Sequence, residues 1–207
     1  MTTILRIDSS SRSTESRSRE LGDHFERAWR ARHPGDRFLR RDLAAQPIAH
    51  ITDTTITGFY AAPDQLSAAQ RVATALSDEL IAELQSAQVL LLTVPMYNFS
   101  LPSALKAWID QIVRVGKTFT YDGTKFSGLV TVQHAYIFCA YGAGGYTDGG
   151  PFSAFNFLEP YLKSLFGFLG IADVQFFAVQ GTTLDLANLA SNLARSKQHI
   201  DSAIAHA

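Results

Sequence analysis

Residues 89–94 read Val89-Leu90-Leu91-Leu92-Thr93-Val94, and Thr93 is the one polar side chain in the run. A short run that is apolar on both faces is typical of a strand in the middle of a parallel sheet, because helices cover both faces of such a sheet. A helical stripe of apolar residues precedes the run over 69–84, and another follows it over 105–113. This order of helix, strand and helix favours an α/β fold.

The same alternation extends to both ends of the chain. Short apolar runs predict four more strands, at 4–7, 38–39, 135–140 and 174–179. Apolar stripes at helical spacing predict further helices, over 16–32, 155–166 and 186–204. The sequence therefore predicts a doubly wound five-stranded parallel sheet with helices on both faces.

Three local features complete the prediction. Residues 117–131 contain Asp122-Gly123 and are expected to form an inserted hairpin. Ser103 is expected to cap the helix after the central strand. Residues 44–63 show no clear period, so we expect a long irregular excursion there. Since no break in composition divides the chain, one domain over residues 1–207 is expected.

Composition excludes several classes of protein. The 207 residues include 18 Lys and Arg against 19 Asp and Glu, a formal net charge of −1. Binding to nucleic acid or an anionic membrane needs a basic surplus, so neither partner is expected. Cys139 is the only cysteine, which excludes an internal disulfide and favours a reducing, cytoplasmic setting. No run approaches the roughly 18 apolar residues that span a bilayer, and no export signal is expected.

In an open parallel sheet, ligands bind beyond the carboxyl ends of the strands. The first such loop, residues 9–18, lacks the glycines of a dinucleotide-binding loop and the Gly-Lys-Ser/Thr of a Walker loop. Its hydroxyl groups, its amides and the following helix N-terminus suit a terminal phosphate, and the spacing of Ser10, Ser16 and Ser18 fits a loop around one monophosphate. The alternative is a Ser-rich turn that caps a helix.

The second loop, residues 95–102, combines Met96, two aromatic residues and Asn98 between prolines. This combination favours a flat heteroaromatic ligand on an apolar wall, and the alternative is a turn whose aromatic side chains cap the core. The third loop, residues 140–146, is rich in glycine and offers backbone N–H donors. Because Thr147 stands where a third glycine would complete a G-x-G-x-x-G pattern, a flexible surface turn is the alternative there.

With these loops, the chain resembles the FMN-dependent NADH-azoreductases, in the flavodoxin-like NAD(P)H:quinone oxidoreductase superfamily, over nearly its whole length. The motifs that carry the resemblance are Pro95-Met96-Tyr97-Asn98-Phe99, Leu105-Lys106 with Trp108, Thr118-Phe119 with Tyr121, Gly128-Leu129-Val130, and residues 167–171 with Asp173-Val174. The resemblance implies a flavodoxin-like fold and bound FMN. It also implies NADH or NADPH as the electron donor, and reduction of quinones and aromatic azo compounds by ping-pong hydride transfer.

The resemblance also assigns residues. It implies that FMN is held by Ser10, Ser16, Arg17, Ser18, Pro95, Met96, Tyr97, Asn98, Phe99, Ala140, Tyr141, Gly142 and Ala143. At 140–143 the family often has Ser-Arg-Gly-Gly, so a hydroxyl and a guanidinium are replaced here by Ala140 and Tyr141. No catalytic side chain is implied, because the cofactor carries the chemistry.

Family members are homodimers with the flavin near the interface, so a homodimer is implied here as well. The candidate walls of the substrate pocket are Phe59, Tyr60, Phe119 and Tyr121, some of them from the partner chain. The alternative role for each of the four is packing in the dimer core. The sequence does not identify the physiological acceptor or decide between NADH and NADPH.

Other functions fit less well. A flavodoxin-type electron carrier would bind FMN without oxidising NAD(P)H directly, but such carriers are strongly acidic and this chain is near neutral. The six histidines (His24, His33, His50, His134, His199 and His206) lack metal-binding spacing, and no G-x-S-x-G elbow is present. Nine basic residues lie between Arg12 and Arg41 against five acids. That stretch is either a patch that attracts an anionic cofactor or a solvated helix face.

Overall fold

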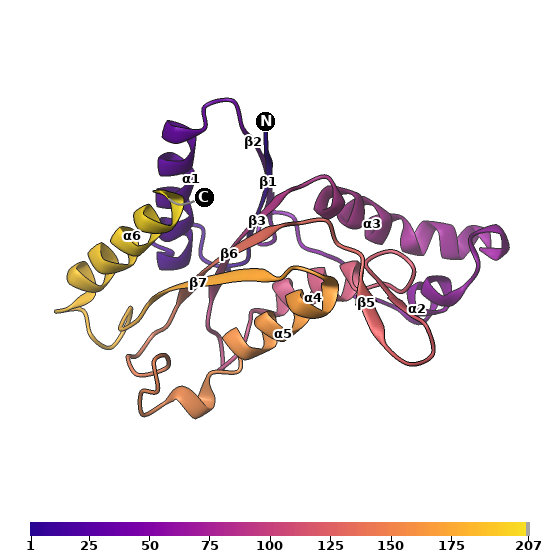
Figure 1. The fold of residues 1–207 in the computed structure, drawn as a ribbon. Coiled ribbons are helices and arrows are strands. Elements are labelled where there is room, and N and C mark those ends of the chain that lie inside the picture. Colours follow the sequence, from indigo (N-terminus) through magenta and orange to yellow (C-terminus); the bar gives the residue numbers. More distant parts are fainter. Residues whose placement is uncertain (206–207) are drawn as a thin grey trace.

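The computed structural model describes residues 1–205 and contains a five-stranded, all-parallel sheet (Figure 1). The strands lie in the order β2 (Arg37–Asp42), β1 (Thr3–Asp8), β3 (Val89–Pro95), β6 (His134–Ala140) and β7 (Asp173–Val179). Numbered within this sheet alone, the order is 2-1-3-4-5, in which the connections reverse direction between β1 and β3. The predicted fold class is confirmed.

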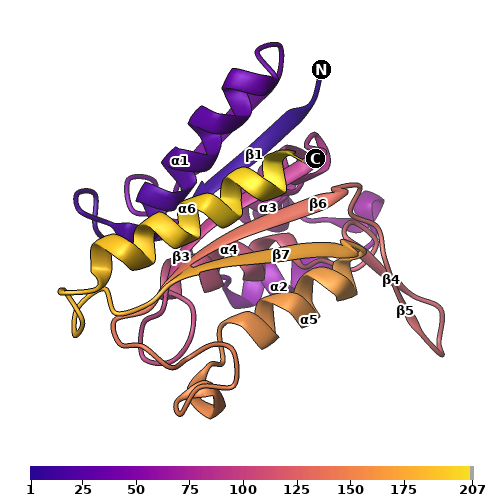
Figure 2. The same cartoon turned by 60° about the vertical axis from the view of Figure 1, so that its left-hand side comes forward.

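Helices cover both faces of the sheet (Figures 1 and 2). On one face lie α1 (Arg17–Arg32) and α6 (Leu189–Ala205), and on the other lie α3 (Ala68–Gln85), α4 (Ser103–Ile112) and α5 (Glu159–Leu169). The short α2 (Asp53–Tyr60) packs against α3. Two 3-10 turns lie at Pro63–Gln65 and Ser153–Phe155.

The central strand explains why its sequence is apolar throughout. All seven residues of β3 are buried. Leu90 and Leu92 join the core under α3, α4 and α5, whereas Val89 and Leu91 join the core under α1 and α6. One strand thus contributes to two hydrophobic cores, as expected for the middle of a doubly wound sheet.

The structure corrects some of the predicted boundaries. The stretch 44–63 is not wholly irregular, since it contains α2, whose N-terminus is closed by reciprocal hydrogen bonds between Thr52 and Thr55. Ser103 is the first residue of α4 and not its cap, because the Pro102 carbonyl accepts hydrogen bonds from the Leu105 and Lys106 amides. The helices predicted from residues 155 and 186 begin later, at Glu159 and Leu189.

The inserted hairpin consists of β4 (Phe119–Tyr121) and β5 (Phe126–Gly128), which pair in antiparallel fashion. Gly128 lies against the backbone at the C-terminal end of α5, next to Leu169 and Gly170. That end of α5 is joined to the start of β7 by the short connection 170–172. The hairpin is therefore attached at the amino-terminal end of the sheet, far from the loops that follow the strands (Figures 1 and 2).

This attachment leaves no room for a side chain at residue 128. A Cβ atom on Gly128 would lie 2.1 Å from the Leu169 carbonyl carbon and 2.2 Å from the Gly170 nitrogen. We expect Gly128→Ala to lower the free energy of unfolding by roughly 1–3 kcal/mol in urea titrations, because backbone must move to admit the methyl group. Gly35→Ala is the control, since no heavy atom lies within 4 Å of its added Cβ. Equal stabilities of the two variants would contradict the tight contact.

Within the described part of the chain, none of the helices combines the length and the apolar character needed to cross a membrane.

Candidate functional site

A cavity of about 410 Å³ opens where the strands end. It is lined by Ser10, Arg12, Glu15, Ser16, Arg17, Pro95, Met96, Tyr97, Ala140, Gly142, Thr182, Thr183 and Leu186. These residues come from the loops after β1, β3, β6 and β7, from the last residues of β3 and β6, and from the first residue of α1. The three loops singled out in the sequence therefore meet in one place, and a fourth loop joins them.

One end of the cavity is built to receive an anion. Ser16 is the N-cap residue of α1, but its hydroxyl makes no capping hydrogen bond to the helix and lies 3.3 Å from the Ser18 hydroxyl. The first amide hydrogen bond of the helix runs from Glu20 to the Ser16 carbonyl, so the amides before it have no partner within the helix. Uncapped amides, two serine hydroxyls and the positive end of the helix dipole together suit a phosphate group.

Arg19 fixes the shape of this end. Its guanidinium donates one hydrogen bond of 2.8 Å to the Ser10 carbonyl and two, of 2.6 and 2.8 Å, to the Asp42 carboxylate. The hydrogen bonds from Arg19 hold the pKa of Asp42 below its ordinary value. Arg19 thus ties the phosphate-type loop to the end of β2.

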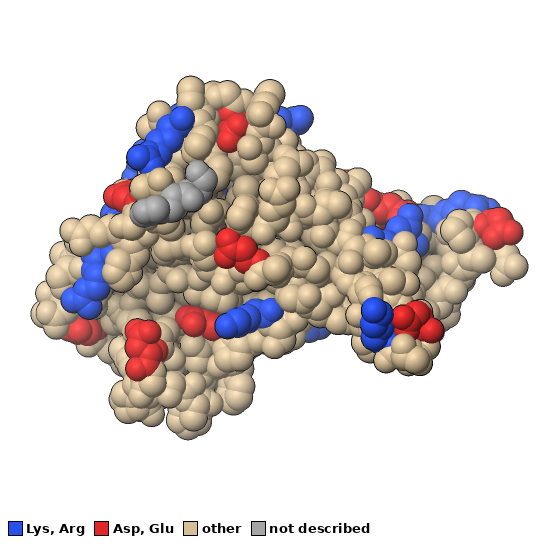
Figure 3. All heavy atoms as spheres, in the orientation of Figure 1, with Lys and Arg blue, Asp and Glu red and all other residues tan. Residues whose placement is uncertain are grey.

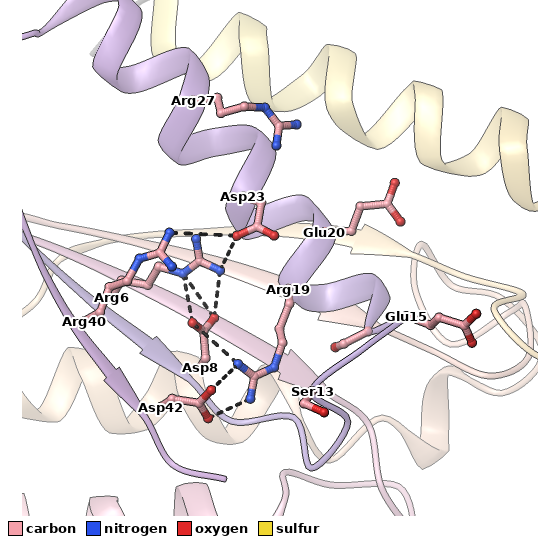
Figure 4. Close-up of a pocket in the computed structure, with 11 residues that line it drawn as sticks. Arg6, Asp8, Ser13, Glu15, Arg19, Glu20, Asp23, Arg27, Arg40 and Asp42 are labelled. Carbon is pink, nitrogen blue, oxygen red and sulfur yellow. Dashed lines mark hydrogen bonds and ion pairs between the residues drawn. The ribbon is translucent and has the colours of Figure 1, made fainter. Parts of the chain in front are cut away.

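A charged network continues from Arg19 beneath α1, around a second cavity of about 450 Å³. Figure 4 shows the Arg6 side chain directed toward Asp8, and the Arg19 guanidinium between Asp8 and Asp42. Arg6 donates three hydrogen bonds to Asp8 and also pairs with Glu26 at 3.1 Å. The carboxylates of the lining neutralise its guanidinium groups, so this cavity does not present an excess of positive charge.

Ion pairs also decide between the two interpretations of the stretch from Arg12 to Arg41, a basic patch or a solvated surface. Six of its nine basic side chains pair with acids: Arg12, Arg17, Arg19, Arg30, Arg40 and Arg41. On the face drawn in Figure 3, basic and acidic side chains are interspersed and form no patch of one sign. The stretch is therefore largely a compensated, solvated surface and not a basic patch.

The other end of the cavity is apolar and rests on a tight turn. Tyr97 and Ser100 exchange backbone hydrogen bonds of 2.9 and 3.0 Å around Asn98 and Phe99, whose φ angles are 48° and 70°. Two positive φ angles define a type I′ turn, and a bulky residue such as Phe99 adopts this conformation at a cost in energy. The turn carries Pro95, Met96 and Tyr97 into the cavity, while the Phe99 ring lies 5.4 Å from that of Phe155.

Two contacts join this turn to its neighbours. The Tyr97 hydroxyl lies 2.8 Å from the Ser11 hydroxyl, which connects the second loop to the first. The Met96 amide donates to the Ala140 carbonyl at 2.9 Å, which connects it to the third. The walls of the cavity therefore hold one another in place.

The third loop contributes mainly backbone. The Tyr141 side chain is fully buried and its hydroxyl donates to Glu159, away from the cavity. Burial raises the pKa of the Glu159 carboxyl. The loop after β7 folds onto this segment, since Thr182 and Thr183 donate amide hydrogen bonds of 3.0 Å to the carbonyls of Tyr141 and Gly142. Sequence reasoning missed this fourth loop, although it follows a strand as the other three do.

The predicted cofactor residues fall into two groups. Eight line the cavity: Ser10, Ser16, Arg17, Pro95, Met96, Tyr97, Ala140 and Gly142. The other five lie beside it: Ser18 is fully buried in α1, Asn98 and Phe99 form the turn, and Tyr141 and Ala143 belong to the third loop. The cavity thus gathers the predicted phosphate and ring segments, with the five remaining residues as their immediate supports.

The predicted pocket aromatics do not line this cavity in the same chain. Phe59 is buried beneath the Arg114 guanidinium, 4.8 Å from the ring centre, whereas Tyr60 is 78% exposed. Phe119 and Tyr121 lie on the hairpin, where both pack around Phe126. Figures 1 and 2 place the hairpin at the far end of the sheet from the loop that follows β7.

Among residues 1–205, no group of three or more His, Cys, Asp or Glu side chains is placed to hold a metal ion. His206 lies outside the described residues. Cys139 is fully buried in β6, and burial raises the pKa of its thiol well above the ordinary value. A low-pKa, reactive cysteine is therefore not part of this site.

A 2-1-3-4-5 parallel sheet, with an anion-binding loop and an apolar slot beyond the strand ends, defines a flavodoxin-like protein. Residues 2–204 match the family model described as "Flavodoxin-like fold". The FMN-dependent NADH:quinone oxidoreductase of Xanthobacter autotrophicus is 54% identical over 84% of each chain, and that of Nostoc punctiforme is 42% identical over 99% of each. The chain belongs to this flavodoxin-like family of FMN-dependent NADH:quinone oxidoreductases.

Solved structures agree on the fold. An FMN-dependent NADH-azoreductase from Bacillus anthracis, crystallised in complex with FMN, has a TM-score of 0.88 and 23% identity, and the match covers 100% of this chain and 99% of that one. An azoreductase from the Sterne strain of the same organism has a TM-score of 0.90 over 99% of both chains.

Proposed function

We propose that this protein is an FMN-dependent oxidoreductase that reduces quinones and aromatic azo compounds with electrons from NADH or NADPH. One observation carries the proposal: a single cavity of about 410 Å³ has an anion-binding end at α1 and an apolar slot at the Tyr97 turn. The named activity of the relatives at 54% and 42% identity supports it.

The residues present fit FMN. Ser10, Ser16 and Arg17, with the first amides of α1, would hold its phosphate, and Ser18 would add a further amide at the same helix end. Bound FMN would supply the redox chemistry that links a nicotinamide donor to a quinone or azo acceptor.

The apolar residues perform the remaining tasks. Pro95, Met96 and Tyr97 exclude water from one side of the slot, and Gly142 lets backbone approach the ligand. Asn98 and Phe99 shape the rim, while Ala140, Tyr141 and Ala143 support the opposite wall. We assign no acid, base or nucleophile among the side chains, since the cofactor carries the reaction.

We also propose that the protein is a homodimer, with one domain spanning residues 1–207. Phe119 and Tyr121 cannot reach the cavity of their own chain, so they can wall a substrate pocket only from a second copy. An apolar groove lined by Leu101, Phe157, Pro160 and Tyr161 among others lies beside the Tyr97 turn and suits burial in such an interface. Sedimentation equilibrium should give twice the 22.7 kDa chain mass, and the mass of one chain would contradict the dimer.

We also propose that the protein is cytoplasmic. The single cysteine is buried and unpaired, which suits a reducing compartment.

Steady-state kinetics test the proposed reaction. Under anaerobic conditions, continuous turnover of NADH should require both added FMN and a quinone, and double-reciprocal plots at several quinone concentrations should be parallel, because both substrates use one site. A protein that binds FMN but oxidises NADH no faster than free FMN would instead be an electron carrier of the flavodoxin type.

A further inference from the structure

The loop after β7 (residues 180–188) is the one wall of the cavity that no recognised motif covers. Thr182, Thr183 and Leu186 from this loop line the cavity. We propose that the Thr183 hydroxyl is a direct hydrogen-bonding ligand of the flavin ring edge. The inference rests on the proposed binding of FMN and names one further residue of that site.

Hydrogen bonds attach this fourth loop to the third loop, residues 140–146. The Tyr141 carbonyl accepts from both the amide and the hydroxyl of Thr182, at 3.0 Å each. The Gly142 carbonyl accepts from the amides of Thr183 and Leu184, again at 3.0 Å. The two loops therefore form one unit, and the carbonyls of Tyr141 and Gly142 are already used within the protein.

The third loop consequently offers few polar groups to a ligand. Ala140 and Gly142, which line the cavity, carry no polar side-chain atom, and Tyr141 is turned into the core. Within residues 1–205, the amides of Gly142 and Ala143 donate no hydrogen bond. This wall thus provides N–H donors, and any side-chain partner for a ligand must come from elsewhere.

Thr183 is placed to be that partner. A Cβ atom built on Gly142 would lie 3.5 Å from the Thr183 hydroxyl oxygen, so the hydroxyl stands directly over the glycine at the cavity wall. The hydroxyl of Thr182 is used by Tyr141, whereas the hydroxyl of Thr183 forms no hydrogen bond among the described residues. A hydroxyl both donates and accepts, so it can meet either the carbonyl oxygens or the N–H of a flavin ring edge.

Hydroxyl-deleting and hydroxyl-retaining variants test this assignment. Thr183→Val keeps the side-chain shape and should raise the Kd for FMN about threefold to tenfold, the typical worth of one hydrogen bond. Thr183→Ser should bind FMN within about twofold of the wild type. Leu184→Ala is the matched control, because Leu184 is on the same loop, is 78% exposed and does not line the cavity. Each Kd is read from the quenching of flavin fluorescence.

Riboflavin has the same ring as FMN but no phosphate, so it tests the ring contact alone. Because the proposed contact is to the ring, Thr183→Val should weaken the binding of riboflavin and of FMN by the same factor. Wild-type affinity for FMN in Thr183→Val, or an equal loss in Thr183→Ser and Leu184→Ala, would overturn the inference and leave FMN binding intact. Failure of the wild-type protein to bind FMN would overturn the proposed function itself, together with the inference.

Discussion

Ser16→Asp is expected to weaken FMN binding by roughly a thousandfold and to leave the fold intact. Ser16 lines the anion-binding end of the cavity and is 93% buried there. Two like charges about 4 Å apart near a protein surface repel by about 4 kcal/mol, which corresponds to roughly three decades in Kd. Aspartate is as good an N-cap residue as serine, so α1 keeps its start at Arg17.

Ser16→Asn is the matched control, because asparagine has the size of aspartate and also caps helices well. Fluorescence titration with FMN should show the large loss in Ser16→Asp only, and both variants should unfold in urea close to the wild type. A similar loss in both variants would mean that size and not charge matters at this position. The prediction that charge repulsion dominates at this helix end would then be wrong.

Arg6→Met is expected to lower the free energy of unfolding by about 3–5 kcal/mol at pH 7, because it leaves the buried Asp8 carboxylate with only the more distant Arg19, at 3.8 Å, as a cationic partner. The Arg6 side chain is 2% exposed, and its partners Asp8 and Glu26 are 6% and 8% exposed. Methionine keeps much of the volume of the arginine side chain, so the loss of unfolding free energy reports on the missing charge and not on a cavity. Urea titration measures the effect.

The pH dependence gives this prediction a second readout. Burial alone would raise the pKa of Glu26, but hydrogen bonds from Arg40, Arg30 and Arg6 hold it below its ordinary value. Such a carboxylate stabilises the fold above its unfolded-state pKa, and this contribution is lost as the pH falls through its folded-state pKa. Without the hydrogen bond from Arg6, the pKa of Glu26 should rise. The difference in stability between wild type and Arg6→Met should therefore narrow from pH 7 toward about pH 4.

Arg30→Ala is the control for this network. Arg30 also pairs with Glu26, but its side chain is 49% exposed, so its loss should cost no more than about 1 kcal/mol. Equal losses in Arg30→Ala and Arg6→Met would contradict the view that burial sets the energy of these pairs.

The sequence predicted the fold because its decisive signal is local. The apolar run at 89–94 requires cover on both faces, and each neighbouring helix shows a stripe of matching length. By contrast, α2 was missed because it spans only Asp53–Tyr60 and its cap is a Thr–Thr pair. The helix packs on α3, where Gly58 lies close to Thr74 and Gln70. No pattern within residues 44–63 reveals that contact.

The site was predictable to the extent that it follows strand ends. The serine-rich loop with Ser10 and Ser16 and the aromatic turn after β3 each have a composition that indicates a ligand site. The loop with Thr183 has no such composition. The role of Arg19 depends on strand register, because β1 and β2 pair with Asp8 opposite Asp42 and so bring two carboxylates to one guanidinium. The distance of Phe119 and Tyr121 from the cavity depends on where the hairpin attaches, and a one-dimensional pattern does not contain that information.

The most direct test of the central claim is an anaerobic visible spectrum of the purified protein reconstituted with FMN. Addition of NADH should bleach the flavin absorption near stoichiometrically, and a subsequent quinone should restore it without any other protein. A flavin that NADH cannot bleach, or no retained flavin at all, would contradict the account of the cavity as the active site of an FMN-dependent NADH:quinone oxidoreductase.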